Sequence, residues 1–488
     1  MPSPDDFQQE SDNFLSWLTQ RPGVAVNPKI YIADLRAQGA GRGVVAQQDI
    51  SEDEILFTIP RDVLLSVQNS KLRDQLPTNL DELGPWLSLM LVMIYEYLQG
   101  EASRWHPYFQ ALPSTFDTLM FWSEPELSEL QASAVIDKIG KQGAESSIRE
   151  TIMPIVRANP SLFPPSLGTP SYDGPEGEEA LLKLAHRMGS LIMAYAFDVE
   201  NQDDDETGED GYVTDDEQEI SQAMVPLADF LNADAHRNNA RLFQEEDSFS
   251  MKSTKPIQKG EEIFNDYGEL PRSDLLRRYG YITDNYSQYD VVELPLETIC
   301  HVAGLQSAKP GADTPPLQLM DELDLLDDGY NISKPTAGDS LPDVVPDELL
   351  SLIQALHLSP EQLAQAQKKQ KPPKPTFDLT AAKFLLQVTQ KRQTQYATSV
   401  AEDDNILNQL AHKQQECTRE EFDTKFRRLA MAVAVRKGEK EILNQFSTGL
   451  ERRIAENQED TVMGDSNPKR SAQAEDGTES NAKRSRKQ

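Results

Sequence analysis

Cysteine and histidine are both scarce in this chain of 488 residues, and their scarcity excludes several kinds of site. The two cysteines, Cys300 and Cys417, lie far apart and can form neither a disulfide framework nor a cysteine-rich zinc cluster. The six histidines are scattered, and none stands at the spacing of paired metal ligands. We therefore expect no metal centre.

Long apolar runs are also missing. No stretch approaches the roughly 20 apolar residues that a membrane-spanning helix needs. The balance of 38% hydrophobic and 26% charged residues is that of an ordinary globular protein, and the length predicts two or three folded units plus tails. The start, MPSPDDFQQESDNF, is acidic and has no apolar core, which argues against a secretory or organellar signal. These features predict a protein of the cytosol or nucleus, with no membrane partner.

Basic residues are the minority among the charges, because 47 Lys and Arg stand against 81 Asp and Glu, a formal net charge of −34. Such a charge disfavours binding to a phosphate backbone, so we expect no specific nucleic-acid partner. It would also speed the encounter with a basic protein. The alternative is that the acidity only keeps a large protein soluble, and charge alone favours neither interpretation.

Two short β-rich blocks are present, far apart in the sequence. Residues 43–60 hold two apolar runs around a polar turn at 51–54, and residues 250–268 repeat this plan around a turn at 259–260. We interpret the first block as a compact two-strand unit with the second built on the same plan. Both blocks are expected to share one core.

Helical periodicity fills much of the remaining chain. Apolar residues at helix spacing over 85–99 and 179–197 predict a helical insertion that splits the β module. After about residue 285 the strand signal fades, and helical patterns follow at 346–358, 380–399 and 419–450. The chain is therefore predicted to be an α+β protein whose second domain is mainly helical.

Three segments have the composition of linkers, loops or tails. Residues 198–219 hold twelve acidic residues and no basic one, which predicts an exposed, disordered loop. Residues 368–375, KKQKPPKP, form a basic, proline-rich connection, and the chain beyond Glu451 is polar enough to predict a disordered tail. In that tail, basic clusters at 469–470 and 483–487 have the spacing of a bipartite nuclear import signal. They predict a nuclear protein with an import carrier as partner; the alternative is a basic tail that contacts the protein's own acidic surface or ribosomal RNA.

Two motifs are weak when taken singly. GAGRGV at 39–44 is similar to a glycine-rich nucleotide loop, but it precedes a strand and lacks the helix of a dinucleotide-binding turn, so a structural turn is the simpler interpretation. In MVPLADFLNADAHRNNA, Asp229 and Asn232 stand three apart and share one face if the segment is a short helix. Asn232 can offer a donor and an acceptor to a polar ligand, or both residues can simply cap backbone groups.

Three tyrosines follow in GEEIFNDYG and RRYGYI. Tyr267 is predicted at the end of a strand, with Tyr279 and Tyr281 just beyond it. Taken separately, such tyrosines are more often core residues than catalytic ones.

The motifs follow one another along the chain in a fixed order: GAGRGV with AQQDISEDEILFTIP, then MVPLADFLN, then GEEIFNDYG with RRYGYI. In this order they make the chain resemble the split SET-domain methyltransferases. The likeness is to the branch that comprises the Rubisco large-subunit methyltransferase and nuclear enzymes acting on ribosomal proteins and transcription factors. RRLAMAVAVRKGEKEIL at 427–443 resembles the helical substrate-binding domain of that branch, so the resemblance covers residues from about 15 to 450. It implies a protein-lysine N-methyltransferase that uses S-adenosyl-L-methionine.

The resemblance also implies a cofactor site. It assigns cofactor binding to the backbone of Ala40, Gly41 and Arg42 and to the side chain of Asn232. Asp229 would support the cofactor loop. Many members have Asn-His where this chain has Asn232-Ala233; because the main contact there is expected from the backbone of Ala233, we retain the activity.

Methyl transfer to lysine further requires a neutral amine. Since a free lysine has a pKa of about 10.4, the site must favour the uncharged form, most simply by desolvating the amine among aromatic rings. The resemblance makes Tyr267 the catalytic tyrosine, whose hydroxyl would orient the amine and contribute to the cofactor site. Tyr279 and Tyr281 would form the wall of the lysine channel, with Tyr195 on the substrate side. Tyr281 would limit the product to monomethyl-lysine.

The predicted organisation is a split SET β-module, one of whose late segments passes through a loop in a knot-like topology, followed by an all-helical substrate-binding domain. The boundaries are 1–67 and 181–288 for the SET parts, 68–180 for the insertion, 289–450 for the helical domain and 451–488 for the tail. The expected substrate is a basic protein of the large (60S) ribosomal subunit, and the enzyme is expected to be a monomer.

Two other functions compete with this one. The first is a non-catalytic acidic adaptor of SET fold that binds basic ribosomal proteins or histones. It has no need for Tyr267 or Asn232. The second is an unrelated nucleotide-binding enzyme, which would need a Lys or Thr beside GAGRGV that is not there.

Overall fold

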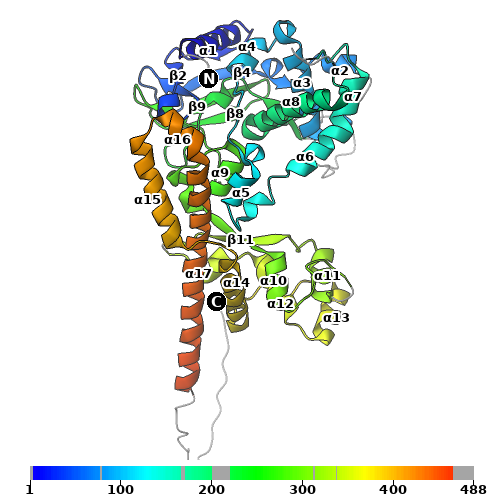
Figure 1. The fold of residues 1–488 in the computed structure, drawn as a ribbon, viewed down its shortest axis with the longest axis vertical. Coiled ribbons are helices and arrows are strands. Elements are labelled where there is room, and N and C mark those ends of the chain that lie inside the picture. The colour runs from blue at the N-terminus through cyan, green and yellow to red at the C-terminus, as the bar shows by residue number, and fades with distance from the viewer. Residues whose placement is uncertain are drawn as a thin grey trace, which may run out of the picture. The chain divides into compact units, whose positions relative to one another are not determined.

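A computed structural model describes residues 4–76, 80–165, 171–200, 220–311, 314–336 and 338–464 (Figure 1). The chain divides into two compact units. The first comprises Met1–Pro295, Asn331–Gly338 and Gln393–Ile442, and the second comprises Leu296–Tyr330, Asp339–Arg392 and Leu443–Gln488. The α+β class predicted from the sequence is confirmed, because the described residues combine small sheets with many helices.

Small antiparallel sheets form the centre of the first unit. Their strand orders are β1-β4-β9-β8, β10-β3-β2 and β5-β7-β6, with a further pair β11-β12. The strands are β1 (Ala25–Val26), β2 (Ile30–Asp34), β3 (Arg42–Ala46), β4 (Ile55–Pro60), β5 (Leu65–Ser66), β6 (Ala196–Glu200), β7 (Ile220–Met224), β8 (Ala240–Gln244), β9 (Ser248–Ser253), β10 (Glu262–Ile263), β11 (Val291–Pro295) and β12 (Gly329–Ser333).

The two β-rich blocks pair with each other rather than within themselves. β4 pairs with β9, opposing Ile59 to Phe249, and β3 pairs with β10, opposing Val44 to Ile263. The predicted two-strand unit at 43–60 is therefore wrong as a pairing, although both of its strands exist. The shared core is confirmed, since these four side chains are buried in one apolar cluster. Pairing follows the burial of apolar faces across the fold, which local turn signals do not specify.

Helices cover these sheets. The predicted patterns at 85–99 and 179–197 correspond to α3 (Gly84–Leu98) and α8 (Gly174–Tyr195), which pack side by side (Figure 1). α3 is apolar on all sides and buried along residues 88–96, as expected of a helix inside a core. α1 (Pro4–Thr19) packs on α4 (His106–Ala111). The other helices of this unit are α2 (Leu72–Gln75), α5 (Glu124–Ser128), α6 (Lys141–Ser147), α7 (Met153–Ala158), α9 (Arg272–Tyr279), α15 (Val400–Glu416) and α16 (Arg419–Lys425).

The second unit is built mainly from helices, as the late periodic patterns predicted. The all-helical prediction for 289–450 is wrong in one respect, because the strands β11 and β12 lie within that stretch. It contains α10 (Leu296–Val302), α11 (Pro315–Glu322), α12 (Asp347–Leu356), α13 (Pro360–Lys369) and most of α14 (Leu379–Gln393), while α17 (Arg427–Gly464) spans residues of both units. α12 buries Leu349, Leu352 and Ile353 at helical spacing. The pattern at 419–450 is divided between α16 and α17, with Phe426 between them.

Two segments that were predicted to be disordered contain regular structure at their first residues. The acidic segment was predicted from residue 198, but residues 198–200 belong to β6, which pairs with β7. The tail was predicted from residue 451, but α17 continues to Gly464, because Glu, Arg, Ala and Gln propagate a helix without burial. The rest of both predictions, including the basic clusters of the tail, falls on 201–219 and 465–488, outside the described residues.

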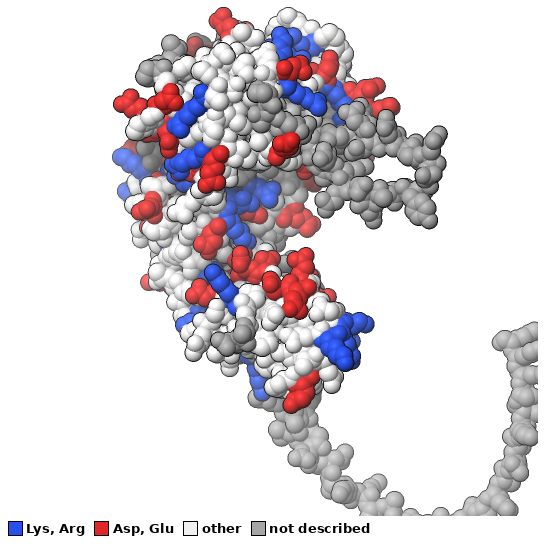
Figure 2. All heavy atoms as spheres, turned by 90° about the vertical axis from the view of Figure 1, so that its right-hand side faces the viewer, with Lys and Arg blue, Asp and Glu red and all other residues white. Residues whose placement is uncertain are grey.

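Charged side chains of both signs lie on the surface. On the face drawn in Figure 2, Asp and Glu are interspersed with Lys and Arg, so that neither sign covers it alone. Among the residues that the structure describes, no helix combines the length and apolar character needed to cross a membrane.

Candidate active site

The glycine-rich motif forms a tight turn in front of β3. A 3-10 turn at Arg36–Gln38 ends at Gly39, whose φ of 95° lies in the left-handed region that favours glycine. The Leu35 amide donates to the Gly41 carbonyl over 2.9 Å, which closes the loop. The structural-turn interpretation is therefore correct, and it is compatible with ligand binding by the same backbone.

Two glycines of this motif have opposite surroundings. A Cβ built on Gly41 would meet no atom within 4 Å, so the backbone there borders open space. A Cβ on Gly43 would lie 2.3 Å from Leu35 Cδ1 and 2.9 Å from Glu262 Oε1, so glycine is required there by close packing. The backbone of Gly41 thus borders open space, whereas the backbone of Gly43 is held by close packing.

The side chain of Arg42 points away from the loop. Its guanidinium bonds to the Glu10 carboxylate over 2.7 Å, to the Ala111 carbonyl over 2.7 Å and to the Ser11 hydroxyl over 2.8 Å. These partners lie on α1 and α4, so the side chain anchors those helices. The cofactor role assigned to the backbone of Arg42 stays a prediction.

Asn232 joins this loop to β10. Its Nδ2 donates to Glu262 Oε1 over 2.7 Å and to the Arg42 carbonyl over 3.3 Å. A 3-10 turn at Ala228–Phe230 ends before Asn232, so Asp229 and Asn232 do not share a helix face. The short-helix prediction fails there because the chain becomes extended at Leu231 and binds the segment around Asn265.

A single parallel bridge brings the tyrosine segment next to this asparagine. Ala233 pairs with Asn265, and the Asn265 amide donates to the Asn232 carbonyl over 2.8 Å. Tyr267 therefore lies beyond the end of β10, not at it, because the strand is only two residues long and the bridge follows. The bridge therefore places Asn232 and Ala233 beside the segment that leads to Tyr267.

Tyr267, Tyr279 and Tyr281 form a cluster beyond this bridge. The Tyr267 hydroxyl donates to the Leu231 carbonyl over 3.2 Å. The ring of Tyr267 stacks on Tyr279 with 4.4 Å between centroids and 12° between planes, and Tyr279 meets Tyr281 edge-on at 6.3 Å. The left-handed Gly280 that ends α9 turns the chain between Tyr279 and Tyr281.

The tyrosine hydroxyls stay protonated at neutral pH. Burial, reinforced by the neighbouring tyrosines, raises the pKa of Tyr267 well above 10. Burial also raises the pKa of Tyr281, and it raises that of Tyr279 to about 12. Tyr195, at the end of α8, has a pKa raised by burial and by the nearby Asp229 and Tyr279. The four side chains thus form uncharged surroundings with polar tips.

Asp229 lies on the aromatic side of the same loop. Its Oδ2 accepts a short hydrogen bond from the Tyr108 hydroxyl, and its buried Oδ1 has no hydrogen-bond partner. Burial raises the pKa of Asp229 to about 7, although the bond from Tyr108 acts against the rise. This carboxyl is therefore attached to α4, and its predicted support of the cofactor loop stays a prediction.

Sequence reasoning missed several residues of this site. Asp234 accepts bonds from the Arg237 guanidinium, from two backbone amides and from the Asn285 side chain. Burial acts to raise the pKa of Asp234, but these bonds outweigh it and lower the pKa to about 2. The spacing of Asp234 and Arg237 was a local signal for this pair. The roles of Glu262 and of the Leu231 carbonyl had no such signal.

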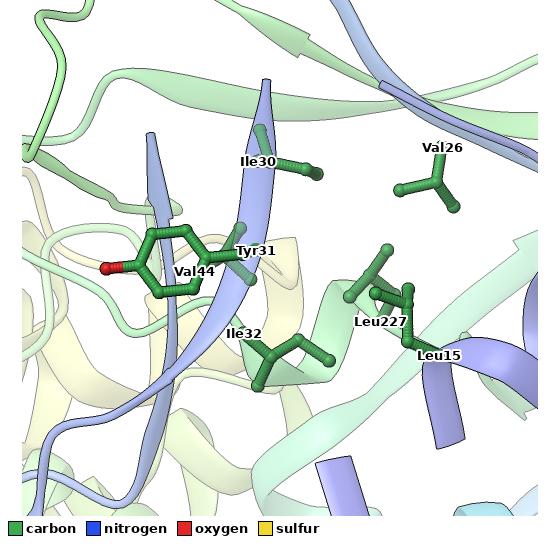
Figure 3. A pocket seen from close by; sticks show the side chains of 7 residues that line it. All are labelled: Leu15, Val26, Ile30, Tyr31, Ile32, Val44 and Leu227. Carbon is green, nitrogen blue, oxygen red and sulfur yellow. The ribbon is translucent and has the colours of Figure 1, made fainter. Parts of the chain in front are cut away.

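An apolar pocket is lined by residues of β2 and β3 and by side chains from other elements. Figure 3 shows its lining side chains, Leu15, Val26, Ile30, Tyr31, Ile32, Val44 and Leu227. It is too narrow to admit a water molecule, so we assign it no chemistry. Among the described residues, no group of three or more His, Cys, Asp or Glu side chains is arranged to hold a metal ion.

Comparisons with known proteins agree with this geometry. The SET domain family matches residues 41–268, and the Rubisco LSMT substrate-binding family matches residues 316–443. Ribosomal lysine N-methyltransferase 4 of Saccharomyces cerevisiae is 37% identical over 306 residues, 60% of this chain and 60% of that protein. N-lysine methyltransferase setd6 of Xenopus laevis is 30% identical over 314 residues, 62% of this chain and 64% of that protein. The matches therefore span less than two thirds of these relatives.

Solved structures show the same fold over more of the chain. The SET domain of LSMT bound to lysine and AdoHcy has a TM-score of 0.66 at 20% identity, and Rubisco LSMT bound to AdoMet has a TM-score of 0.64 at 20% identity. Each covers 94% of this chain and 94% of the other. Residues 41–268 of this chain are therefore similar to the SET domain family and residues 316–443 to the Rubisco LSMT substrate-binding family, and the whole shares the fold of Rubisco LSMT.

Proposed function

We propose that this protein is a protein-lysine N-methyltransferase that uses S-adenosyl-L-methionine. The observation that carries the proposal is the meeting of the Tyr267 hydroxyl with the Leu231 carbonyl, inside a cluster of protonated tyrosines and next to Asn232. Its relatives in yeast and frog are named as lysine methyltransferases. A non-catalytic adaptor would need none of this arrangement.

The residues around the glycine loop fit the cofactor. The backbone of Ala40, Gly41 and Arg42 borders open space at Gly41, where a ligand can approach without a side chain in its way. Because Asn232 Nδ2 donates to Glu262 and Arg42, its Oδ1 is the atom that can accept a bond from the cofactor's ammonium group. The backbone of Ala233, held by the bridge to Asn265, completes this side.

The tyrosines would prepare the lysine amine. When bound, S-adenosylmethionine supplies a methyl group on a positively charged sulfur, and its transfer to the neutral amine leaves methyl-lysine and S-adenosylhomocysteine. Aromatic faces favour the uncharged amine, so the lysine loses its proton to solvent before reaction. Tyr267 keeps its own proton, and it therefore orients the amine and stabilises nearby positive charge rather than acting as a base. Leu231 supplies a carbonyl oxygen for the same purpose.

The proposed substrate is a basic protein of the large ribosomal subunit. The name of the yeast relative and the net charge of −34 support this class, since opposite charge speeds association. Residues 316–443 would contribute the binding surface for this protein. We further propose that Tyr281, whose ring meets Tyr279 edge-on, limits the product mostly to monomethyl-lysine, because its hydroxyl can hold the amine or a water where a second methyl group would need space.

The function is tested by incubating the full chain with labelled S-adenosylmethionine and a mixture of ribosomal proteins from the large subunit. One labelled protein band is expected with the wild-type chain, and none with Tyr267→Phe. If no protein of the mixture is labelled while the chain binds the cofactor, the ribosomal substrate is wrong. If the chain binds no cofactor, the enzyme class is wrong.

We also propose a nuclear location, supported by the two basic clusters at 469–470 and 483–487. Residues 461–488 fused to a fluorescent protein too large to diffuse through nuclear pores should enter the nucleus. The matched control replaces Lys483, Arg484, Arg486 and Lys487 by alanine and should stay outside. Cytoplasmic signal from the intact fusion would remove this proposal.

A further inference from the structure

An arginine far along the chain contacts the glycine-rich loop. Arg419, the first residue of α16, donates from Nη1 to the carbonyl of Ala37 over 2.9 Å. Its Nη2 lies against Gly39, where a Cβ would be only 2.4 Å away. The guanidinium therefore occupies the place that a side chain at residue 39 would take.

The contact suits the local chemistry of the loop. Ala37 belongs to the 3-10 turn Arg36–Gln38, whose carbonyl end attracts a cation. A planar guanidinium can donate to a carbonyl while its flat face covers a glycine, which an ammonium group cannot do. Asp423, one turn along α16, holds the guanidinium from the other side at 3.4 Å.

Other supports of the loop act within it and on elements earlier in the chain. Arg36 pairs with Asp34 at 2.7 Å and stands over the ring of Phe7 in α1 at 3.9 Å. Arg42 anchors the loop to α1 and α4, and Asn232 donates to the Arg42 carbonyl. Arg419 comes from 382 residues further on, in the range that matches the substrate-binding family. Both α16 and the loop lie in the first compact unit.

From these contacts we infer that Arg419 is a positioning residue for the cofactor loop. It holds Ala37 and Gly39, and so sets the backbone of Ala40 and Gly41 that follows. The inference rests on the proposed function, because it takes this loop as the cofactor site. Arg419 acts on the binding of the cofactor and not on methyl transfer, since its contacts are with the loop and not with the tyrosine cluster.

The experiment measures the binding of S-adenosylmethionine to the full chain by calorimetry. Arg419→Ala should raise Kd about fivefold, the loss expected for one charge-assisted hydrogen bond at a partly exposed site. Arg419→Lys should give a smaller rise, because it keeps the charge but uncovers Gly39. The matched control is Lys425→Ala on the same helix, whose ion pair is with Glu421 at 2.7 Å, and it should leave Kd unchanged.

A second measurement separates positioning from a general structural role. At saturating S-adenosylmethionine, the rate of labelling a fixed ribosomal-protein mixture should equal that of the wild type for Arg419→Ala and for Arg419→Lys. Equal Kd values in Arg419→Ala and the wild type would overturn the inference and leave the proposed function standing. A lower rate at saturating cofactor would overturn it as well. A wild-type chain that binds no S-adenosylmethionine would overturn both.

Discussion

Asp229 and Asp234 lie on one loop, both largely buried, and their carboxyl groups behave in opposite ways. Burial raises the pKa of Asp229 to about 7, and its surroundings include the rings of Tyr108 and Phe230. The pKa of Asp234 is lowered to about 2, because the bonds from Arg237 and Asn285 outweigh its burial. Two factors make the difference: Asp229 is the more strongly desolvated carboxyl, and Asp234 receives more hydrogen-bond donors.

The same contrast divides the whole site. On the aromatic side, hydroxyl groups keep their protons and charge is disfavoured, which suits a lysine that must be neutral. On the polar side, Asn232 and Asp234 are tied by hydrogen bonds, which suits the precise grip of a charged cofactor. Changes on the aromatic side should therefore alter the rate, and changes on the polar side should alter cofactor affinity.

The largest expected effect is on the aromatic side. Tyr267→Phe removes one hydroxyl and keeps the ring that stacks on Tyr279, so we expect methyl transfer to fall by about a hundredfold or more. Cofactor affinity should change far less. Labelling rates and calorimetry on the same preparation measure both, with Tyr289→Phe as a control outside the cluster. Near wild-type turnover would make Tyr267 an ordinary core residue.

On the polar side, Asn232→Ala removes two hydrogen bonds that join the loop to β10. We expect the Kd for S-adenosylmethionine to rise about tenfold, as for the loss of one or two such bonds. The rate at saturating cofactor should fall much less than in Tyr267→Phe. Asn238→Ala, in the same loop, changes a contact with the exposed Lys255 and serves as the control. Should Asn232→Ala lower the rate without changing Kd, the division into two sides is wrong.

The buried acid allows a test by pH. The pKa of Asp229 is raised to about 7 from about 3.9 in the unfolded chain, so the folded state holds its proton more tightly. Stability then falls as pH rises from about 4 to about 7. Asp229→Asn removes this titration, while its carbonyl can still accept a hydrogen bond from Tyr108. The free energy of unfolding of the variant, relative to that of the wild type, should therefore rise by on the order of 2 kcal/mol when the pH is raised from about 5 to about 8.

Thermal unfolding of the cofactor-free chains at the two pH values measures this gain. Asp234→Asn is the informative comparison, because the low pKa of Asp234 predicts the opposite sign. That variant should be less stable than the wild type at both values. If the difference in stability between Asp229→Asn and the wild type does not change with pH, Asp229 is ionised in the folded state at both pH values.

The smallest expected effect concerns the product. Tyr281→Phe removes a hydroxyl beside Tyr279 and leaves the ring in place, so we expect a modest shift from monomethyl-lysine towards dimethyl-lysine at a similar total rate. Mass spectrometry of the labelled substrate measures the ratio. Mainly trimethylated product from the wild-type chain would contradict the role given to Tyr281.

Much of the fold could be predicted because its signals are local. The apolar periodicity of α3 and α8 located both helices to within a few residues, and the apolar runs located β3 and β4. The predicted strand pairing was wrong, since β3 pairs with β2 and β10 and not with β4. The beginning of the tail was also misplaced, because composition reports the lack of a core and not the persistence of α17.

The sequence by itself determined the classes of structure and chemistry: an α+β chain, a glycine-rich turn before a strand, an asparagine, and tyrosines in a fixed order. Only the tertiary structure decided which of them meet. Asn232 reaches the Arg42 carbonyl across 190 residues, Tyr108 reaches Asp229 across 121, and Arg419 reaches Ala37 across 382. Burial in the tertiary structure raises the pKa of Asp229, whereas Asp234 takes most of its donors from the neighbouring His236 and Arg237 and one from the distant Asn285.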